Sequence, residues 1–205
     1  MNGEKHWESV FQRKTAREQS WYKPHLERSL TLLQAAGIER SAAVIDVGGG
    51  TSTFVDDLLE LGYADLTVLD VSETALKTTQ ERLGANAARV QWIAADITQV
   101  TLPEKRFDFW HDRAVFHFLV DEQARHRYVA TVRRALRPGG HIVVATFGEG
   151  GPEKCSGLDV VRYNAESLHA EFGSTFQKVG SFEETHVTPW GSEQAFVYCY
   201  CRLSA

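Results

Sequence analysis

The most informative part of this sequence is AAVIDVGGGTST, residues 42–53. Its apolar first half, residues 42–47, predicts a strand that is buried on both faces. Three glycines follow at positions 48–50, where they permit a positive φ and let the backbone come close to a ligand. A helix is expected from about Thr51 to Leu61. A buried strand, a glycine-rich turn and a helix in this order indicate an α/β protein.

Short apolar segments alternate with amphipathic ones on both sides of this stretch. The alternation predicts a parallel sheet with helices on both faces. Residues 177–186 and 194–201 are two extended segments that we expect to pair antiparallel and to close one edge of the sheet. Further strands are expected at residues 66–69, 90–94, 107–110 and 141–147, and helices at residues 4–19, 25–36, 72–84, 124–136 and 165–172.

The composition is that of a single globular domain. The chain has 205 residues, of which 43% are hydrophobic and 24% are charged, and this argues against disorder or a coiled coil. The net charge of -5 gives no support for nucleic-acid binding. No apolar run approaches the roughly 20 residues of a membrane helix, and the first residues lead into polar sequence. A cytoplasmic protein with neither nucleic-acid nor membrane partners is therefore expected.

The three cysteines indicate neither a disulfide nor a metal site. Cys199 and Cys201 are two residues apart in an expected strand, where they share a face and are poorly placed for a disulfide. Cys155 stands alone in a loop-like segment beside Lys154. It could bind a soft substrate, but the expected role is that of an incidental free thiol. No residues have the spacing of metal ligands, so no metal is expected.

Three acidic residues lie at the ends of three successive expected strands: Asp46, Asp70 and Asp96. Asp70 follows Gly50 by 20 residues, where a carboxylate can accept hydrogen bonds from two ribose hydroxyls. Asp46 precedes the glycines, where an anion suits an amino-acid ammonium, and Asp96 can accept from an adenine amino group. The alternative interpretation is that Asp46 and Asp96 cap a helix or a turn. The three acids together favour S-adenosylmethionine (SAM).

A nicotinamide dinucleotide is the competing ligand. The third glycine of the dinucleotide fingerprint is replaced here by Thr53, which argues against close packing of a pyrophosphate. An oxidoreductase with a Tyr-x-x-x-Lys pair is also disfavoured, since none of Tyr63, Tyr128 and Tyr163 is followed by lysine four residues later. SAM is therefore the expected cofactor.

On these residues the chain resembles a class I SAM-dependent methyltransferase. The glycine loop is similar to the first motif of that superfamily, and LRPGGH at residues 136–141 is similar to the turn before its fifth strand. The resemblance covers essentially the whole chain. It implies a Rossmann-like α/β fold, a seven-stranded mostly parallel sheet with an antiparallel last strand and helices on both faces, with S-adenosylhomocysteine (SAH) as the product. The cofactor-binding residues that it implies are Asp46, Gly48, Gly49, Gly50, Thr51, Asp70, Val71, Asp96 and Ile97.

A narrower resemblance is to thiopurine S-methyltransferases and related thiol and halide methyltransferases. It rests on FWHDRA at residues 109–114, where the family's Trp-Asp-Arg-Gly becomes His-Asp-Arg-Ala. In those enzymes an N-terminal aromatic helix lies over the methionine end of SAM. The resemblance implies this role for Trp7 and Phe11, and Trp21 and Tyr22 could complete the lid. The alternative is an aromatic cluster that holds the N-terminal helices on the sheet.

Arg113, Asp112 and His111 are the expected catalytic residues. Arg113 follows the fourth strand at the carboxyl edge, where open α/β sheets bind ligands, and its guanidinium suits a carboxylate or another anion. Its alternative role is an ion pair with Asp112 or Asp121. His111, Asp112 and His117 are candidate bases for an acceptor that must lose a proton. The resemblance also places His111 beside the cofactor.

The chain is expected to form a single methyltransferase domain with three regions. These are a helical lid at residues 1–40, a SAM-binding core at residues 41–147, and an acceptor-side loop with C-terminal strands at residues 148–205. The predicted reaction moves a methyl group by in-line displacement to a small acceptor that is anionic or carries a thiol. A protein lysine methyltransferase, with a protein acceptor, is the first alternative. A non-catalytic SAM-binding protein is the second.

Overall fold

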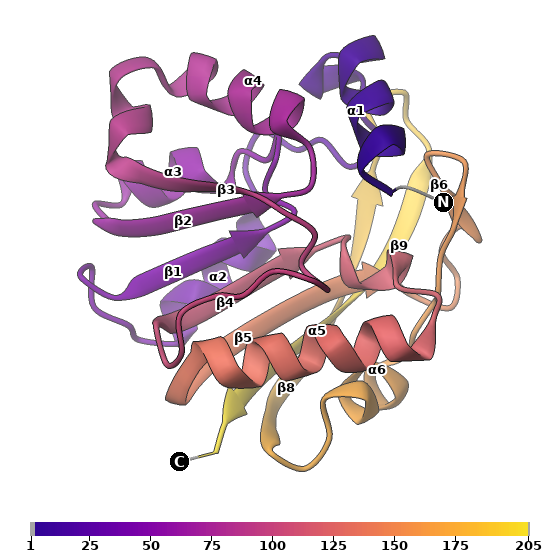
Figure 1. The fold of residues 1–205 in the computed structure, drawn as a ribbon. Helices are drawn as coiled ribbons and strands as arrows, with labels where there is room; N and C mark the ends of the chain where they lie inside the picture. Colours follow the sequence, from indigo (N-terminus) through magenta and orange to yellow (C-terminus); the bar gives the residue numbers. More distant parts are fainter. Residues whose placement is uncertain (1–2, 205) are drawn as a thin grey trace.

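A seven-stranded sheet forms the centre of the computed structural model, which describes residues 3–204 (Figure 1). The strand order is β3-β2-β1-β4-β5-β9-β8, and only β9 runs antiparallel to its neighbours. The predicted fold class is therefore confirmed, including the antiparallel last strand. The strands are β1 (Ala43–Val47), β2 (Asp65–Asp70), β3 (Val90–Ala94), β4 (Phe107–Arg113), β5 (Leu136–Phe147), β8 (Phe176–Val187) and β9 (Glu193–Leu203).

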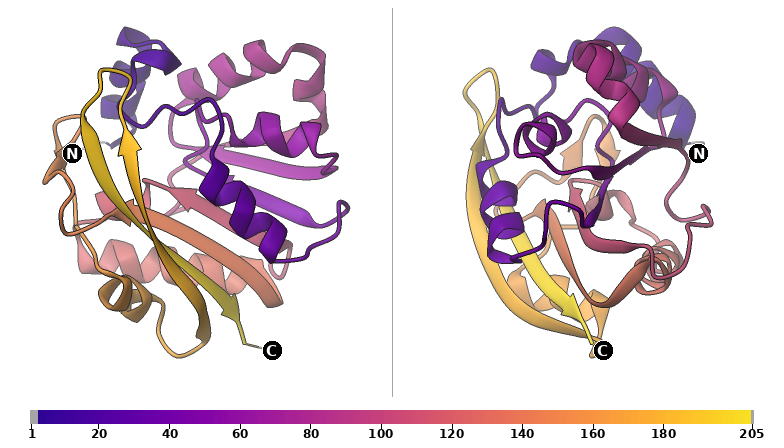
Figure 2. Two further views of the ribbon diagram at one scale, coloured as in Figure 1. Left: turned by 180° about the vertical axis from the view of Figure 1, so that it is seen from behind. Right: turned by 90° about the vertical axis from the view of Figure 1, so that its left-hand side faces the viewer.

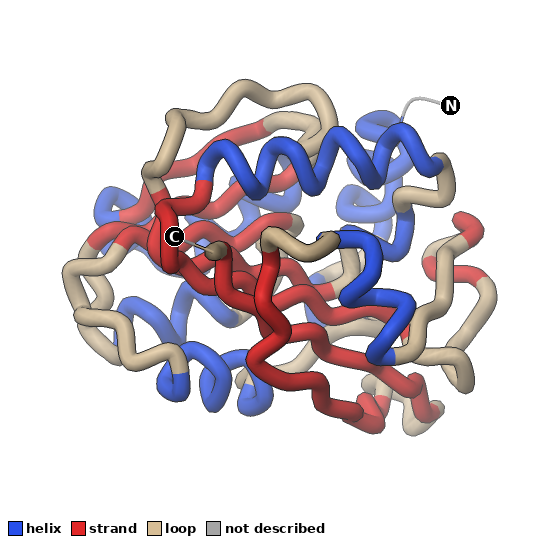
Figure 3. The backbone as a smooth tube through the Cα atoms, turned by 90° about the horizontal axis from the view of Figure 1, so that it is seen from below, coloured by secondary structure: helices blue, strands red, loops and turns tan. Residues whose placement is uncertain are grey.

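Helices lie on both faces of this sheet (Figure 3). Two of them begin where the sequence offers a capping side chain: the Ser72 hydroxyl accepts the Ala75 N–H at 3.1 Å, and Asp121 accepts the Ala124 N–H at 3.0 Å. A short hairpin of β6 (Lys154–Cys155) and β7 (Leu158–Asp159) is an addition that the sequence did not predict. The helices are α1 (Gly3–Arg13), α2 (Glu27–Ala35), α3 (Phe54–Glu60), α4 (Glu73–Leu83), α5 (Glu122–Ala135) and α6 (Ala165–Phe172), with 3-10 turns at Ala16–Glu18, Gly84–Arg89 and Phe116–Phe118.

The sheet has one hydrophobic core on each face, because successive side chains of a strand point to opposite sides. Ile45 of β1 packs in the core covered by α5 and α6. Its neighbour Val44 packs in the core covered by α2 and α3. Within residues 3–204 no helix is both long enough and apolar enough to cross a membrane.

Two elements differ from the prediction in ways that bear on the site. The first helix ends at Arg13 rather than near residue 19, because Thr15 and Glu18 form a capping box that starts a new turn. The fourth strand continues to Arg113 rather than ending at residue 110, since its ladder with β5 pairs His111 with Val143 and Arg113 with Ala145. The polar side chains of residues 111–113 therefore belong to the strand and do not mark its end.

Segments from both ends of the sequence meet at the carboxyl edge of the sheet. Figure 2 shows α1 and the β8–β9 hairpin on the same side of the molecule. The chain between α1 and α2 is tied to the hairpin, because His186 donates to the Ser20 carbonyl at 2.6 Å and Lys23 pairs with Glu184 at 2.8 Å. The region above the carboxyl edge of the sheet is therefore built from segments that are far apart in the sequence.

Candidate cofactor and acceptor site

A cavity of about 910 Å³ lies at this carboxyl edge. Its volume is within the range of small-molecule sites, roughly 300–1,000 Å³. Among the predicted site residues, Gly49, Gly50 and Asp112 do not reach its wall. The predicted residues that line it are Trp7, Phe11, Trp21, Tyr22, Asp46, Gly48, Thr51, Asp70, Val71, Asp96, Ile97, His111 and Arg113.

The glycine loop lets two carboxylates lie directly beneath the backbone. Gly48 has a φ of +71°, and a Cβ there would collide with the Val115 side chain. A Cβ at Gly49 would meet the Asp46 carboxylate, and one at Gly50 would lie 2.6 Å from Asp70 Oδ2. Gly49 and Gly50 therefore make room for acids that themselves line the cavity.

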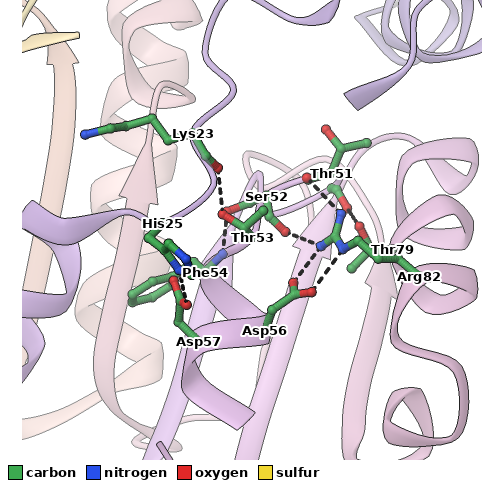
Figure 4. Close-up of polar contacts among 11 residues, drawn as sticks. Lys23, His25, Thr51, Ser52, Thr53, Phe54, Asp56, Asp57, Thr79 and Arg82 are labelled. Atoms are coloured by element: carbon green, nitrogen blue, oxygen red, sulfur yellow. Dashed lines mark hydrogen bonds and ion pairs between the residues drawn. The ribbon is translucent and has the colours of Figure 1, made fainter. Parts of the chain in front are cut away.

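The loop is fixed from behind by α4, as Figure 4 shows. Arg82 donates to the carbonyl oxygens of Thr51 and Ser52, at 3.2 Å and 2.6 Å, and pairs with Asp56 at 2.7 Å. The Thr79 hydroxyl donates to the Gly50 carbonyl. Sequence reasoning missed these contacts, since no motif marks Thr79 or Arg82. They hold the loop in one conformation before a ligand binds.

Asp70 is held by backbone N–H groups on both of its oxygens. Oδ2 accepts from Gly50 at 3.0 Å and Oδ1 accepts from Ser72 at 2.9 Å. Each oxygen keeps a further lone pair, which leaves the carboxylate able to accept hydroxyl groups. Burial raises the pKa of Asp70 to about 6, against the effect of these hydrogen bonds.

Asp96 lies on the cavity wall and also caps a turn. Oδ1 accepts from the Thr98 N–H at 2.8 Å and from its hydroxyl at 2.7 Å, while Oδ2 accepts from the Gln99 side chain at 2.8 Å. The capping interpretation therefore holds for Asp96. The hydrogen bonds also keep its carboxylate in one orientation at the cavity.

Asp46 shows the best fit to a cationic group. It is 2% exposed and lines the cavity; its Oδ1 lies 2.6 Å from Nδ1 of His111. Its Oδ2 is buried and has no hydrogen-bond partner among the described residues. A buried carboxylate oxygen without a donor is costly, and a ligand ammonium would satisfy it. Together with Asp70 and the glycine loop, this oxygen makes the cavity suitable for SAM.

The alternation of β4 separates the three expected catalytic residues. His111 and Arg113 point to the cavity side, whereas Asp112 points towards α5, where its Oδ2 accepts from the Tyr128 hydroxyl at 2.7 Å. Burial raises the pKa of Asp112 to about 6. The expected role of Asp112 as a base that contacts the acceptor is therefore wrong, because its side chain is fully buried on the other face.

The two candidate histidine bases also form hydrogen bonds within the protein interior. Both ring nitrogens of His111 have buried partners, Asp46 at 2.6 Å and the Ser29 hydroxyl at 2.8 Å. His117 is fully buried beside Phe147, whose N–H it accepts at 3.2 Å, and burial lowers its pKa to about 3. The structure therefore corrects the expectation that either histidine takes a proton from an acceptor.

Arg113 is anchored by uncharged groups. Its Nε donates to the Tyr198 hydroxyl at 3.2 Å, its Nη1 donates to the Trp21 carbonyl at 3.0 Å, and its guanidinium lies 4.5 Å from the centre of the Phe196 ring. Its Nη2 is buried without a partner among the described residues. The alternative of an ion pair with Asp112 is wrong, since that carboxylate lies on the opposite face.

Asp121 is not the partner of Arg113 either. Its carboxylate caps α5, accepting the Ala124 N–H at 3.0 Å, and lies 3.9 Å from Arg127.

Aromatic residues close the cavity on the side of α1. The Trp7 ring lies edge-on to Phe118 and Trp21, at centroid distances of 4.9 Å and 5.9 Å. The Glu8 carboxylate accepts the Thr74 N–H at 3.2 Å and so joins α1 to the start of α4. The aromatic rings therefore belong both to the cavity wall and to the contact that holds α1 in place.

The three cysteines are free thiols. Cys155 lines the cavity from β6, but burial raises its pKa to about 11, so it is protonated at neutral pH. The sulfur atoms of Cys199 and Cys201 are 3.2 Å apart in β9. The described residues hold no group of three or more acidic, histidine or cysteine side chains that could bind a metal.

Known proteins resemble the chain in both sequence and fold. Residues 44–140 match the family described as a methyltransferase domain. The chain is 28% identical over 150 residues to the eEF1A lysine and N-terminal methyltransferase of Bos taurus, a match that covers 70% of this chain and 21% of that protein. This chain thus spans about a fifth of the length of that relative.

Two solved structures share the fold over nearly the whole chain. One is described as the conversion of a disulfide bond into a thioacetal group during echinomycin biosynthesis, with a TM-score of 0.81, 21% identity and coverage of 98% of this chain and 92% of that one. The other is the 1,6-didemethyltoxoflavin-N1-methyltransferase of Burkholderia thailandensis with 1,6-didemethyltoxoflavin and SAH bound, with a TM-score of 0.74, 22% identity and coverage of 100% and 88%.

The chain has the fold of these methyltransferase structures, and a methyltransferase-domain family matches its residues 44–140. The cavity and its buried carboxylates suit SAM as a ligand. The narrower resemblance to thiopurine S-methyltransferases remains a prediction.

Proposed function

We propose that this protein transfers a methyl group from SAM to a small acceptor that is anionic or carries a thiol, with Arg113 as the acceptor-binding residue. One observation carries the proposal. Arg113 lies on the wall of the cavity with one guanidinium nitrogen buried and without a partner among residues 3–204. A buried donor of this kind is stabilised by an acceptor oxygen, and a carboxylate or another anion supplies one.

The charges around Arg113 support an anionic acceptor. Glu184 is paired with Lys23 at 2.8 Å, and that contact uses the nearby carboxylate. Arg113 itself forms no ion pair within the described part of the chain and is held by a hydroxyl, a carbonyl and an aromatic ring. Its guanidinium is therefore fixed in place without a direct ion-pair partner, although its charge helps to lower the pKa of the nearby Glu184 against the effect of burial, and this preorganisation lowers the cost of binding an anion.

The commitment of the three predicted bases to other contacts supports an acceptor that is nucleophilic at neutral pH. Methyl transfer needs alignment and exclusion of water, and SAM supplies the reactive methyl group. A thiolate needs no proton removed, whereas an ammonium group must first lose one. Asp112, His111 and His117 are all bonded or buried away from an acceptor. The three side chains thus stabilise the structure around the site and do not transfer a proton from the acceptor.

A protein lysine acceptor is the second candidate. It is supported by the lysine methyltransferase among the relatives. In this arrangement α1 covers the cavity through Trp7, Phe11 and Glu8. A lysine on a protein surface would require α1 to move. A protein that binds SAM without transferring a methyl group is the remaining alternative.

The test separates these three functions in a single incubation. The purified protein, methyl-labelled SAM and an extract of its own cells are mixed and then divided by a size cut-off filter. Label in the small-molecule fraction supports the proposal. Label retained on protein overturns it in favour of the lysine acceptor. Label in neither fraction, with SAM binding shown separately, overturns it in favour of a non-catalytic protein.

Variants then test the role of Arg113 once an acceptor is found. Arg113→Met is expected to lower kcat/KM for the acceptor by about tenfold or more, which corresponds to roughly 1.4 kcal/mol, with SAM affinity unchanged. Arg202→Met is the matched control, since Arg202 is exposed near the far end of β9. Equal kinetics for Arg113→Met and the control would contradict the role.

A further inference from the structure

A row of three buried polar side chains joins helix α2 to the cofactor side of the cavity. Ser29 of α2, His111 of β4 and Asp46 of β1 are at most 2% exposed. The Ser29 hydroxyl lies 2.8 Å from Nε2 of His111, and Nδ1 of His111 lies 2.6 Å from Asp46 Oδ1. The Phe54 ring packs 4.2 Å from the imidazole, so apolar contact surrounds the row.

The hydrogen bonds fix which nitrogen of His111 carries a proton. An ionised Asp46 can only accept, so Nδ1 of His111 donates to it. In the neutral ring Nε2 is then an acceptor, and the Ser29 hydroxyl donates to it. Ser29 therefore gives the second nitrogen of this tautomer a hydrogen-bond partner. The same bond fixes the plane of the ring.

Only one oxygen of Asp46 is satisfied by this row. Oδ1 is taken by His111, while Oδ2 has no partner within the described residues and lies beneath Gly49 at the cavity. Rotation of the carboxylate plane out of this orientation would lengthen or break the bond to His111. The row thus holds one oxygen away from the ligand and leaves the other for it.

We propose that Ser29 and His111 are positioning residues that hold the Asp46 carboxylate towards the ammonium of the cofactor's amino-acid moiety. The inference rests on the proposed function only in requiring that the cavity bind SAM, and it is independent of the acceptor. Ser29, His111 and Asp46 are also hydrogen-bonded in the same order as the Ser-His-Asp triad of a hydrolase. The Ser29 hydroxyl is fully buried and does not line the cavity, so it cannot meet a substrate.

Two probes distinguish positioning from a general structural role. SAH contains the amino-acid ammonium, whereas 5′-methylthioadenosine keeps the nucleoside and the sulfur but lacks that group. Calorimetric titration of both ligands into the full-length protein shows which part of the ligand a variant affects. Damage to the fold weakens both ligands, whereas loss of Asp46 positioning weakens SAH alone. Wild-type protein that binds neither probe would instead overturn the SAM-binding function itself.

Three variants test the row. His111→Leu removes the donor to Asp46 and is expected to lower SAH affinity by about tenfold, with methylthioadenosine affinity unchanged. Ser29→Ala leaves Nε2 of His111 without its partner, so the ring is held less firmly, and the variant is expected to lower SAH affinity by about threefold. His111→Asn places an amide N–H where Nδ1 lies, and we expect it to bind SAH within about threefold of wild type.

A spectroscopic measurement keeps the test usable if His111→Leu fails to fold. In wild-type protein we expect an imidazole NMR pattern with a proton on Nδ1, and in Ser29→Ala we expect the Nε2 signal to shift, because that nitrogen loses its hydrogen-bond partner. The inference would be overturned if Ser29→Ala lost the same affinity for SAH and for methylthioadenosine. It would also be overturned if Ser29→Ala and His111→Leu both bound SAH as tightly as wild type. A wild-type ring protonated at Nε2 alone would also overturn it.

Discussion

The Tyr128 hydroxyl of α5 donates a 2.7 Å hydrogen bond to Oδ2 of Asp112, while Oδ1 of the same carboxylate accepts the Val115 N–H at 2.9 Å. Between Asp112 and Val115 the chain passes through Ala114, which has a φ of +74°. A residue other than glycine in this region is strained by about 1 kcal/mol. The Tyr128–Asp112 pair therefore stabilises a strained turn next to Arg113.

Tyr128→Phe is expected to lower the free energy of unfolding by about 1–3 kcal/mol, because it leaves a buried carboxylate oxygen without its donor. Denaturant unfolding measures the change. Tyr200→Phe is the matched control, since that hydroxyl bonds to the half-buried His141 at 2.7 Å. A loss for Tyr128→Phe no larger than that of the control would show that the pair contributes little.

SAM binding is expected to depend on the ionisation of Asp70. Burial raises the pKa of Asp70 to about 6 in the free protein, and the ionised form accepts ligand hydroxyl groups best. Affinity should be constant above about pH 7 and fall by up to about tenfold per pH unit below pH 6. Calorimetric titration from pH 5 to 8 measures this. Asp70→Asn should bind more weakly with a flatter profile; a profile as steep as that of wild type would point to another group.

The stability of the fold is expected to depend on a neutral His117. Its pKa is lowered from 6.5 to about 3 by burial. Between these two pH values the histidine is protonated in the unfolded chain and neutral in the folded chain. This contribution is fully present above about pH 6.5 and is lost as the pH falls towards 3, at about 1.4 kcal/mol per pH unit.

His117→Asn removes this titration while keeping an acceptor for the Phe147 N–H. The variant should therefore lose less stability than wild type between pH 6.5 and 4, as measured by urea unfolding at each pH. Parallel curves for the two proteins would show that His117 is not the group responsible.

Removal of α1 is expected to weaken SAM binding more than it weakens the fold. The helix has no buried residue, yet Trp7 and Phe11 line the cavity. The deletion should cover residues 3–14 and spare Gln19 and Trp21, because Gln19 accepts from the Thr51 hydroxyl at 2.6 Å and Trp21 accepts from Arg113. Thermal unfolding and SAH titration are compared with Glu8→Ala, which removes one contact with α4. Unchanged SAH affinity after the deletion would rule out a lid.

The sequence predicted the sheet, and the structure places the predicted Asp46, Gly48 and Asp70 on the wall of one cavity. There the residues lie close together in sequence, and a glycine turn with Asp46 and Asp70 follows directly from one strand–turn–helix unit. The acceptor side was harder, since Arg113 is held by Trp21 and Tyr198, which are 92 and 85 residues away. The error at Asp112 has a simple cause: once β4 is extended to Arg113, alternation alone sends Asp112 to the opposite face.

The position of β9 has a consequence for how the nascent chain matures. β9 lies between β5 and β8, although the ribosome produces it after both. Until it is made, β5 has an unpaired edge, and Arg113 lacks both Phe196 and Tyr198. The segment that shapes the nucleoside end, residues 43–113, has by then left the ribosome. During synthesis the molecule therefore completes the glycine-loop side of the cavity before Arg113 has all of its partners.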